Sequence, residues 1–514
     1  MSVSWIRRSW NWLTLTLLRR WIAGLLAGIS GAAVFLVIYH LANPSQQCAP
    51  GVEHRGPASE CTGVTDGSFA FTARLNLVEN AILRENSNLG GGRHATVALL
   101  LPLTSPDPGT QAEILHAVQG AYAAQYHANH STDLKPPIRL VLANPGRGSS
   151  QYLPVARELA GMTGPPDNLR AAVGISVSTD TTKAEVGWLT RHGIPVVGGA
   201  ITADDLANPL AGQQPFPGLA RIEPTNSQEA SALAHFGDVN APQALLVEDT
   251  RTDDDYITTL ASAFAKVMTR SPYQPYQFTS PPDESESGDT SNTFRSMVPN
   301  ICDTKARWIY FAGRQVQLRQ FINQLATRGC QSQHFTILTG SAASHLQSDP
   351  ELDRGAFGRA ITLDYAAIAS PDAWPRSGAP ATGGSPADYQ AFDTTLRAGA
   401  KAPEGPVGPV GVADGQAIIN YDATWTAITG IREATSDGTP MPSRQDIASG
   451  WRQLNGEHKV LGASGWICLD NAGNPYDKAV AIVRYIITGK PQFVTDAWPA
   501  GAPPEAPCLI PKNG

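Results

Sequence analysis

The sequence is poor in charged residues and has no concentration of positive charge outside its N-terminal segment. Asp, Glu, Lys and Arg make up 16% of the 514 residues, and the formal net charge is −7. Binding to nucleic acid requires a clustered basic surface that neutralises phosphates. The chain lacks such a cluster, so we expect no nucleic-acid partner.

Motifs of common catalytic and metal sites are also absent. The sequence contains no P-loop, no His-Glu-x-x-His and no Gly-x-Ser-x-Gly pattern, which mark phosphate loops, zinc proteases and serine hydrolases. His127 and His130 lack the spacing and the third ligand of a metal site, and no Cys-x-x-Cys occurs. We therefore predict a protein that is not an enzyme and holds no cofactor or metal, although the sequence does not show which residues of a triad meet in space.

Cysteine is absent from the first 47 residues, and all six cysteines follow them. An even number of cysteines in one part of a chain predicts disulfides formed in an oxidising compartment. Six cysteines allow many connectivities. Our prediction pairs nearest neighbours: Cys48–Cys61, Cys302–Cys330 and Cys468–Cys508.

One long apolar segment, Trp21–Leu41, contains no Asp, Glu, Lys or Arg. At about 1.5 Å per residue, a helix of this length spans the roughly 30 Å hydrocarbon core of a bilayer. Arginines that precede the segment are Arg7, Arg8, Arg19 and Arg20. Because positive charge stays in the cytoplasm, we predict a single-pass protein of the cell membrane with an extracytoplasmic C-terminal part. A cleaved signal peptide is the alternative, but the segment is longer than a usual signal core.

Apolar segments with strand and helix periodicity alternate after residue 93. Residues 95–103 and 306–313 are almost continuous apolar runs, typical of parallel strands covered on both faces. Residues 110–130 and 415–434 have helical periodicity. This alternation predicts right-handed crossovers and open, doubly wound parallel sheets. It restarts near residue 227, so we predict an α/β protein with two lobes.

The polar segment 280–292 is predicted to be a loop. We divide the chain into seven parts: 1–20 cytoplasmic segment, 21–42 transmembrane anchor, 43–93 stalk and short helix, 94–219 lobe 1, 220–362 lobe 2, 363–460 return to lobe 1, and 461–514 return to lobe 2 with the C-terminal tail.

Several short segments together resemble one protein family. They are LLLPLTSPDPG (99–109), VGISVSTDTT (173–182), IPVVGGAITADDL (194–206), NYDATWTAI (420–428) and GASGWICLDNAGNP (462–475). The pattern is similar to that of the branched-chain amino acid binding proteins of ABC transporters, which have the type I periplasmic-binding fold. The resemblance implies two α/β lobes joined by three crossovers that close on a ligand.

Candidate ligand-binding residues lie where strands end, because open α/β sheets bind ligands at their C-terminal strand ends. The resemblance implies that Ser176, Ser178, Ala200 and Thr202 contact a ligand carboxylate. Hydroxyls and backbone N–H groups at a helix N-terminus suit such an anion. The remaining candidates at neighbouring strand ends are Thr179, Asp249 and Ser341. Helix capping is the alternative role for a Ser, Thr or Asp that precedes a helix.

The family's acidic contact for an ammonium group has no clean match in this sequence, so the ligand is predicted to be amino acid-like or another small carboxylate. Two functions remain open. The first is a receptor that clamps a small polar ligand for an ABC permease or a sensor protein. The second is a pseudo-receptor or scaffold of the same fold that binds a protein partner. A receptor should hold polar loops around a void of roughly several hundred Å3, which a scaffold should fill.

Overall fold

The structure is a computed structural model that describes residues 47–89, 93–131, 136–283, 286–399, 401, 406–435, 441–486, 488 and 490–510. The chain divides into two compact units, residues 1–61 and 62–514. The predicted cytoplasmic segment and anchor lie outside the described residues. Within the described ranges, no helix has both the length and the apolar character needed to span a bilayer.

The described part of the first unit is a short antiparallel hairpin. Strands β1 (Gln47–Ala49) and β2 (Val52–Arg55) pair, and the disulfide Cys48–Cys61 closes the segment. Strand β3 (Glu60–Thr65) runs across the boundary into the second unit. The sequence patterns predict a polar stalk here, so these strands are an addition to the expected fold.

The second unit contains two sheets, of which the first has the strand order β3-β5-β4-β6-β7-β8. The strands after β3 are β4 (Ala95–Leu100), β5 (Ile138–Asn144), β6 (Leu169–Gly174), β7 (Val196–Gly198) and β8 (Leu219–Arg221). Strands β4 to β8 are parallel to their neighbours, and β3 runs antiparallel to β5. Nearly every residue of β4 is fully buried, which explains why its sequence is a continuous apolar run.

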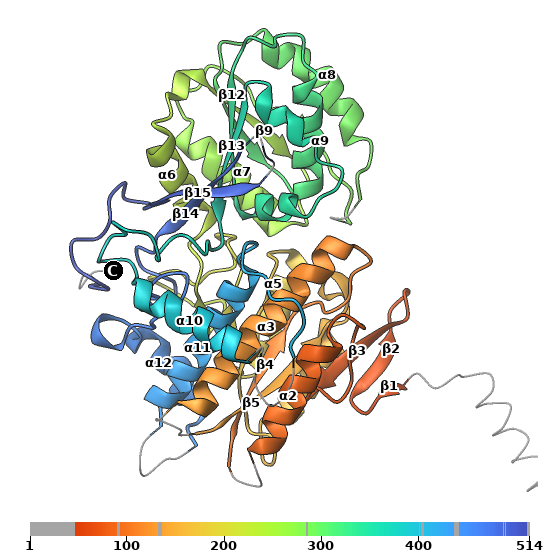
Figure 1. The fold of residues 1–514 in the computed structure, drawn as a ribbon, viewed down its shortest axis with the longest axis vertical. Coiled ribbons are helices and arrows are strands. Elements are labelled where there is room, and N and C mark those ends of the chain that lie inside the picture. The colour runs from red at the N-terminus through yellow and green to blue at the C-terminus, as the bar shows by residue number, and fades with distance from the viewer. Residues whose placement is uncertain are drawn as a thin grey trace, which may run out of the picture. The chain divides into compact units, whose positions relative to one another are not determined.

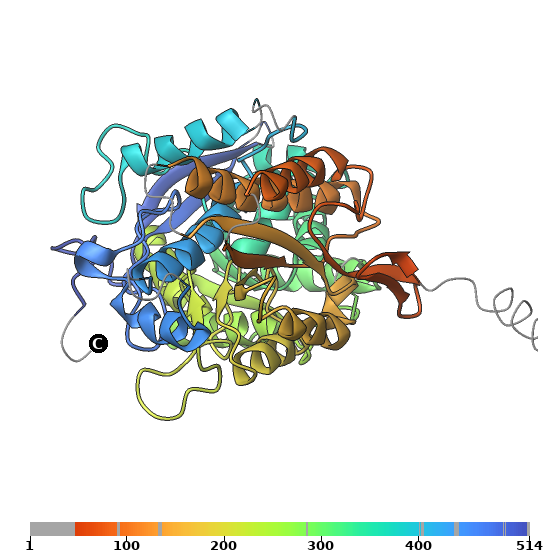
Figure 2. The same ribbon diagram turned by 90° about the horizontal axis from the view of Figure 1, so that it is seen from below.

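Helices cover both faces of the first sheet. They are α2 (Asn76–Asn88), α3 (Pro108–His130), α4 (Tyr152–Gly161), α5 (Asp180–Arg191), α10 (Pro386–Gly399), α11 (Gln416–Glu433) and α12 (Arg444–Gly450). Ala98 and Leu100 of β4 share a core with residues of α4 and α5. Helix α3, drawn in orange in Figures 1 and 2, packs against α2, α10 and α11. Gly120 permits this approach, because a Cβ there would lie 2.1 Å from the carbonyl oxygen of Ala417.

The second sheet has the order β10-β9-β11-β12-β13-β14-β15. Its strands are β9 (Ala244–Asp249), β10 (Tyr276–Phe278), β11 (Trp308–Ala312), β12 (Phe335–Thr339), β13 (Ile361–Ala367), β14 (Val480–Tyr485) and β15 (Pro491–Ala497). Its helices are α6 (Asn226–Gly237), α7 (Asp255–Val267), α8 (Thr290–Cys302) and α9 (Gln315–Ala326). Short 3-10 turns of the second unit are η1 (Arg147–Ser149), η2 (Ala241–Gln243), η3 (Ser341–Gln347), η4 (Arg354–Gly358), η5 (Trp451–Gln453) and η6 (Gly456–His458).

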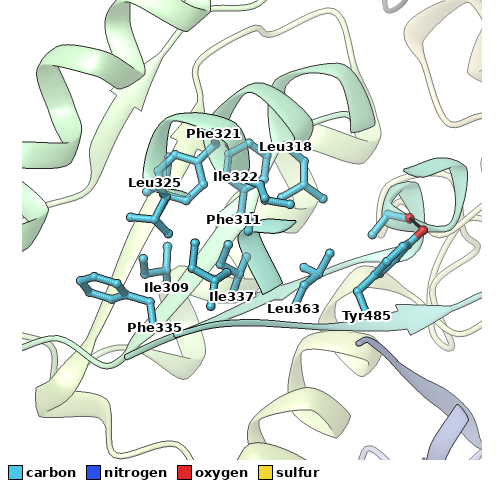
Figure 3. Packing of buried hydrophobic residues seen from close by; sticks show 14 of the residues in the cluster. Ile309, Phe311, Leu318, Phe321, Ile322, Leu325, Phe335, Ile337, Leu363 and Tyr485 are labelled. Atoms are coloured by element: carbon cyan, nitrogen blue, oxygen red, sulfur yellow. Dashed lines mark hydrogen bonds between the residues drawn. The ribbon is translucent and has the colours of Figure 1, made fainter. Parts of the chain in front are cut away.

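Alternate residues of the second sheet's strands enter two separate cores. Ile309 and Phe311 of β11 pack with residues of α8 and α9, and Figure 3 shows them beside Phe321. Tyr310 points to the other face and packs with residues of α6 and α7. This two-residue period is that of a strand covered by helices on both faces.

Both sheets are mixed rather than purely parallel, which corrects the sequence-based prediction. Strand β14 runs antiparallel to β13 and to β15. Helix α8 begins at Thr290, inside the segment 280–292 that we expected to be a loop. Its first turn is polar, and the first buried apolar residue of the helix is Phe294.

The chain crosses between the two sheets three times. It passes from β8 to α6, returns from β13 toward α10 and α11, and passes from α12 to β14. The disulfides Cys302–Cys330 and Cys468–Cys508 are present. All three bridges therefore pair nearest neighbours, as predicted. The exact lobe boundaries stay a prediction.

Candidate functional site

A cavity of about 170 Å3 lies where the strands of the two sheets end. The first sheet contributes the loops that follow β4, β6 and β7, and the second contributes residues that follow β11 and β12. We call this space the cleft cavity. An apolar cavity of about 150 Å3 holds a benzene molecule, so this one accommodates a similarly small ligand.

Four of the predicted residues line the cleft cavity: Ser176, Ser178, Ala200 and Ser341. Ser178 is only 2% exposed. Its hydroxyl oxygen accepts a hydrogen bond from the Ala203 N–H at 3.3 Å. The hydroxyl proton then remains to be donated, which suits a carboxylate oxygen.

The other three predicted residues lie outside the cavity lining. Thr179 is the N-cap of α5, where its side chain accepts from the Thr182 N–H at 3.3 Å. Thr202 is buried, and its carbonyl oxygen accepts from the Asn226 N–H at 2.7 Å. Capping is therefore the observed role of Thr179.

Asp249, predicted as a ligand-binding residue, instead organises the loop at the end of β9. Its Oδ1 accepts from the N–H groups of Arg251 at 3.1 Å and Ser280 at 3.0 Å. The carboxyl groups that do line the cavity belong to Glu113 on α3 and Asp283.

The sequence patterns missed the arginines of the site. Arg314, which follows β11, and Arg147, in η1, both line the cleft cavity. Arg314 donates from Nε and Nη2 to the two carboxylate oxygens of Asp254, each at 2.8 Å. Its guanidinium also stacks over the Tyr256 ring at 4.6 Å. Nothing in the spacing of the sequence connects Arg314 with Asp254, because they follow different strands.

The pKa shifts of the cavity wall follow from burial and this ion pair. Burial alone raises the pKa of Asp254, but Arg314 and Arg251 lower it below the ordinary value. Burial raises the pKa of the Tyr256 hydroxyl, and Glu229 adds to the effect. At neutral pH Tyr256 therefore remains a neutral hydroxyl, and Asp254 remains a carboxylate.

Direct contacts between the two lobes close the cleft. The carbonyl oxygen of Ser178 accepts from the Tyr256 N–H at 3.0 Å and from Arg314 Nη2 at 3.4 Å. Glu113 accepts from Nδ1 of His345, which lies in η3. The cleft cavity, at about 170 Å3, is therefore smaller than the several hundred Å3 expected for a receptor, although these contacts do not fill it completely.

A possible metal group in the first unit is explained by its disulfide. Ligand atoms of Cys48, His54 and Cys61 lie within 4.8 Å of one another. Both sulfur atoms belong to the Cys48–Cys61 bridge, and a metal thiolate site needs deprotonated cysteines.

Comparison with known proteins identifies the fold. No family model matches the sequence, and no curated protein matches it. Among solved structures, the isoleucine-bound branched-chain amino acid binding protein LivJ of Streptococcus pneumoniae is similar, with a TM-score of 0.55 and 16% identity over 78% of this chain and 99% of that chain. The chain has the type I periplasmic-binding fold.

Two further structures share the type I periplasmic-binding fold with this chain. The leucine-binding protein LivK of Thermotoga maritima has a TM-score of 0.57 and 18% identity over 79% of this chain and 100% of its own. A solute-binding protein of R. palustris, solved with 4-hydroxybenzoate, has a TM-score of 0.55 and 13% identity over 79% of this chain and 98% of its own. In this fold, the cleft cavity lies between the two lobes.

Proposed function

We propose that the chain is a membrane-anchored, extracytoplasmic solute-binding protein that clamps a small carboxylate between its two lobes. The observation that carries this proposal is the cleft cavity, whose walls bring together hydroxyl groups of one lobe and Arg314 of the other. Guanidinium and hydroxyl groups are the ordinary donors to a carboxylate.

The proposed ligand carries one carboxylate and is small enough for the cleft cavity of about 170 Å3. Ser176, Ser178 and Arg147 of the first lobe supply donors, and Arg314 faces them from the second. Glu113 and Asp283 offer acceptors for an ammonium or hydroxyl group at the far end of the ligand. Two of the similar structures named above contain a bound carboxylate, isoleucine in LivJ of Streptococcus pneumoniae and 4-hydroxybenzoate in the R. palustris protein, and this supports the proposal.

Binding acts by favouring the closed arrangement of the lobes. A ligand that touches both walls has more contacts when the cleft is closed, so it shifts the equilibrium in that direction. The three crossings act as the hinge. The closed form then presents one surface to an ABC permease or a sensor protein.

The proposed location rests on the sequence and the disulfides. Residues 21–42 anchor the chain, with the N-terminus in the cytoplasm. Three disulfides in the remaining chain suit an oxidising compartment.

The test is a thermal-shift screen of amino acids and small aromatic and aliphatic carboxylates on the oxidised full-length chain. A ligand at about 100 times its Kd should add about 2.7 kcal/mol of stability. Calorimetry should show that Ser178→Ala lowers the affinity for the compound found in the screen at least tenfold. Ser296→Ala, on the surface of α8, should leave this affinity unchanged. A folded sample that responds to no compound would contradict the proposal and favour the protein-binding scaffold.

A further inference from the structure

A second, larger cavity of about 760 Å3 lies at the opposite edge of the first sheet. It is lined by residues at the starts of β6 and β8, by the segment before β7 and by α12 with the residues that follow it. In parallel strands the starts and the ends lie on opposite edges of the sheet, so this space is separate from the cleft cavity. The two cavities share no lining residue.

The walls of this second cavity carry positive charge only. Three arginines line it, Arg170, Arg444 and Arg452, and none of its lining residues is Asp or Glu. We call it the arginine cavity. In the part of the chain that the structure describes, none of the three forms an ion pair with a carboxylate. Three like charges around one space repel one another unless an anion lies between them.

Arg170, the second residue of β6, is held in place without charge compensation. Its Nη1 donates to the carbonyl oxygens of Thr163 at 3.1 Å and Leu169 at 3.0 Å. Its Nε is buried and has no hydrogen-bond partner. A buried donor without an acceptor is costly. Burial, together with Arg444, lowers the pKa of Arg170.

Arg444 in α12 and Arg452 in η5 contribute the other two guanidinium groups. Arg444 donates from Nη1 to the carbonyl oxygen of Gly193 at 2.9 Å, which fixes one edge of its guanidinium. Arg452 is exposed, and its side chain forms no hydrogen bond or ion pair with the residues that the structure describes, so it can turn toward a bound anion. Trp451 between them is anchored by its indole N–H, which donates to the Gly218 carbonyl oxygen at 2.9 Å.

Neutral hydrogen-bonding groups complete the lining. The side chains concerned are Gln214, Gln445, Ser449 and Asn471. The volume falls within the range of about 300–1,000 Å3 that is usual for small-molecule sites. A space of this size and charge suits a ligand larger than a single chloride or phosphate ion.

We propose that the arginine cavity binds a small polyanion, a molecule that carries two or more phosphate or carboxylate groups. Arg170 binds one anionic group, and Arg444 and Arg452 bind the second. Phosphate and carboxylate share this chemistry because both accept paired hydrogen bonds from a guanidinium.

The experiment is isothermal titration calorimetry on the full-length chain in mild detergent, with tripolyphosphate and citrate as separate probes. The variant is Arg452→Gln, since Arg452 is exposed and its loss should not disturb folding. The matched control is Arg307→Gln, an exposed arginine ahead of β11 in the other lobe. A second variant, Arg170→Gln, tests the contribution of Arg170.

We expect saturable binding of at least one probe, weakened at least fivefold by Arg452→Gln and by Arg170→Gln but not by Arg307→Gln. Preference for tripolyphosphate or for citrate identifies a phosphate or a carboxylate ligand. Ser178→Ala should leave this binding unchanged, which separates it from the cleft cavity. Absence of binding by both probes, or an equal loss in Arg452→Gln and Arg307→Gln, would overturn the proposal.

Discussion

Arg314 and Asp254 form a paired contact in which Nε and Nη2 of the arginine each lie 2.8 Å from a carboxylate oxygen. Both side chains belong to the second lobe, and Arg314 continues from this pair to the carbonyl oxygen of Ser178 in the first lobe. Asp254 thus holds the guanidinium in the orientation in which it reaches across the cleft.

Asp254→Asn should destabilise the protein strongly. It removes the charge that compensates Arg314 and Arg251, and removing one member of a buried ion pair costs about 3–5 kcal/mol. Urea denaturation measures this change in the free energy of unfolding. Asp253→Asn is the matched control, because Asp253 is exposed and forms an ion pair with Arg251. Equal losses in the two variants would show that the burial of the pair is unimportant.

Glu185 should make the protein less stable as the pH rises. Burial raises the pKa of its carboxyl from 4.5 to about 8, and a hydrogen bond from Ser149 offsets this only in part. Between these two values the unfolded chain has lost the proton while the folded chain keeps it, so the folded state is progressively disfavoured. Each pKa unit corresponds to about 1.4 kcal/mol.

Glu185→Gln should therefore flatten the fall in the free energy of unfolding across this pH window. Urea denaturation at several pH values measures the slope. Glu457→Gln, at an exposed position, should leave it unchanged. An unaltered slope in Glu185→Gln would contradict the raised pKa.

Lys478 and Glu223 should be energetically coupled. Lys478 Nζ lies 3.0 Å from Glu223 Oε1 and also donates to the Ile222 carbonyl oxygen and the Ser464 hydroxyl, so it joins two of the three crossings. Burial raises the pKa of Glu223 to about 7, and Lys478 keeps it from rising further.

Lys478→Met should cost about 3 kcal/mol of stability at neutral pH, because Glu223 is left buried without its cation. Adding Glu223→Gln should recover part of the loss, and a double-mutant cycle measures the coupling. Lys266→Met, at an exposed position on α7, serves as the control. Additive effects of the two substitutions would argue against the pair.

Much of the fold could be predicted from local pattern, because strands buried on both faces are apolar throughout. β11 lies within the predicted strand 306–313, and α3 matches the predicted helix 110–130 closely. The predicted strand 95–103 is too long, since β4 ends at Leu100. Leu101 and Leu103 are also buried, but in the loop that enters the cleft, and periodicity does not separate these two cases.

Of the candidate site, the sequence could predict mainly the residues that lie together in one loop. Ser176 and Ser178 share the loop after β6, so the sequence displays them together. Arg314 and Glu113 reach the same cavity from different lobes, and their meeting depends on tertiary packing. The sequence pattern also fails to predict helix α8, because the polar first turn and Pro299 interrupt the helical periodicity of its apolar residues.

The close contact of α3 with α11 also determines the order in which the protein can be completed during synthesis. Helix α3 ends at His130, but its partner begins only at Gln416. A ribosome that adds about 5–20 residues per second needs roughly 15–60 s to make the intervening chain. During this interval the Gly120 face of α3 lacks its cover, so the packing of the first lobe is completed only after the second lobe has been synthesised.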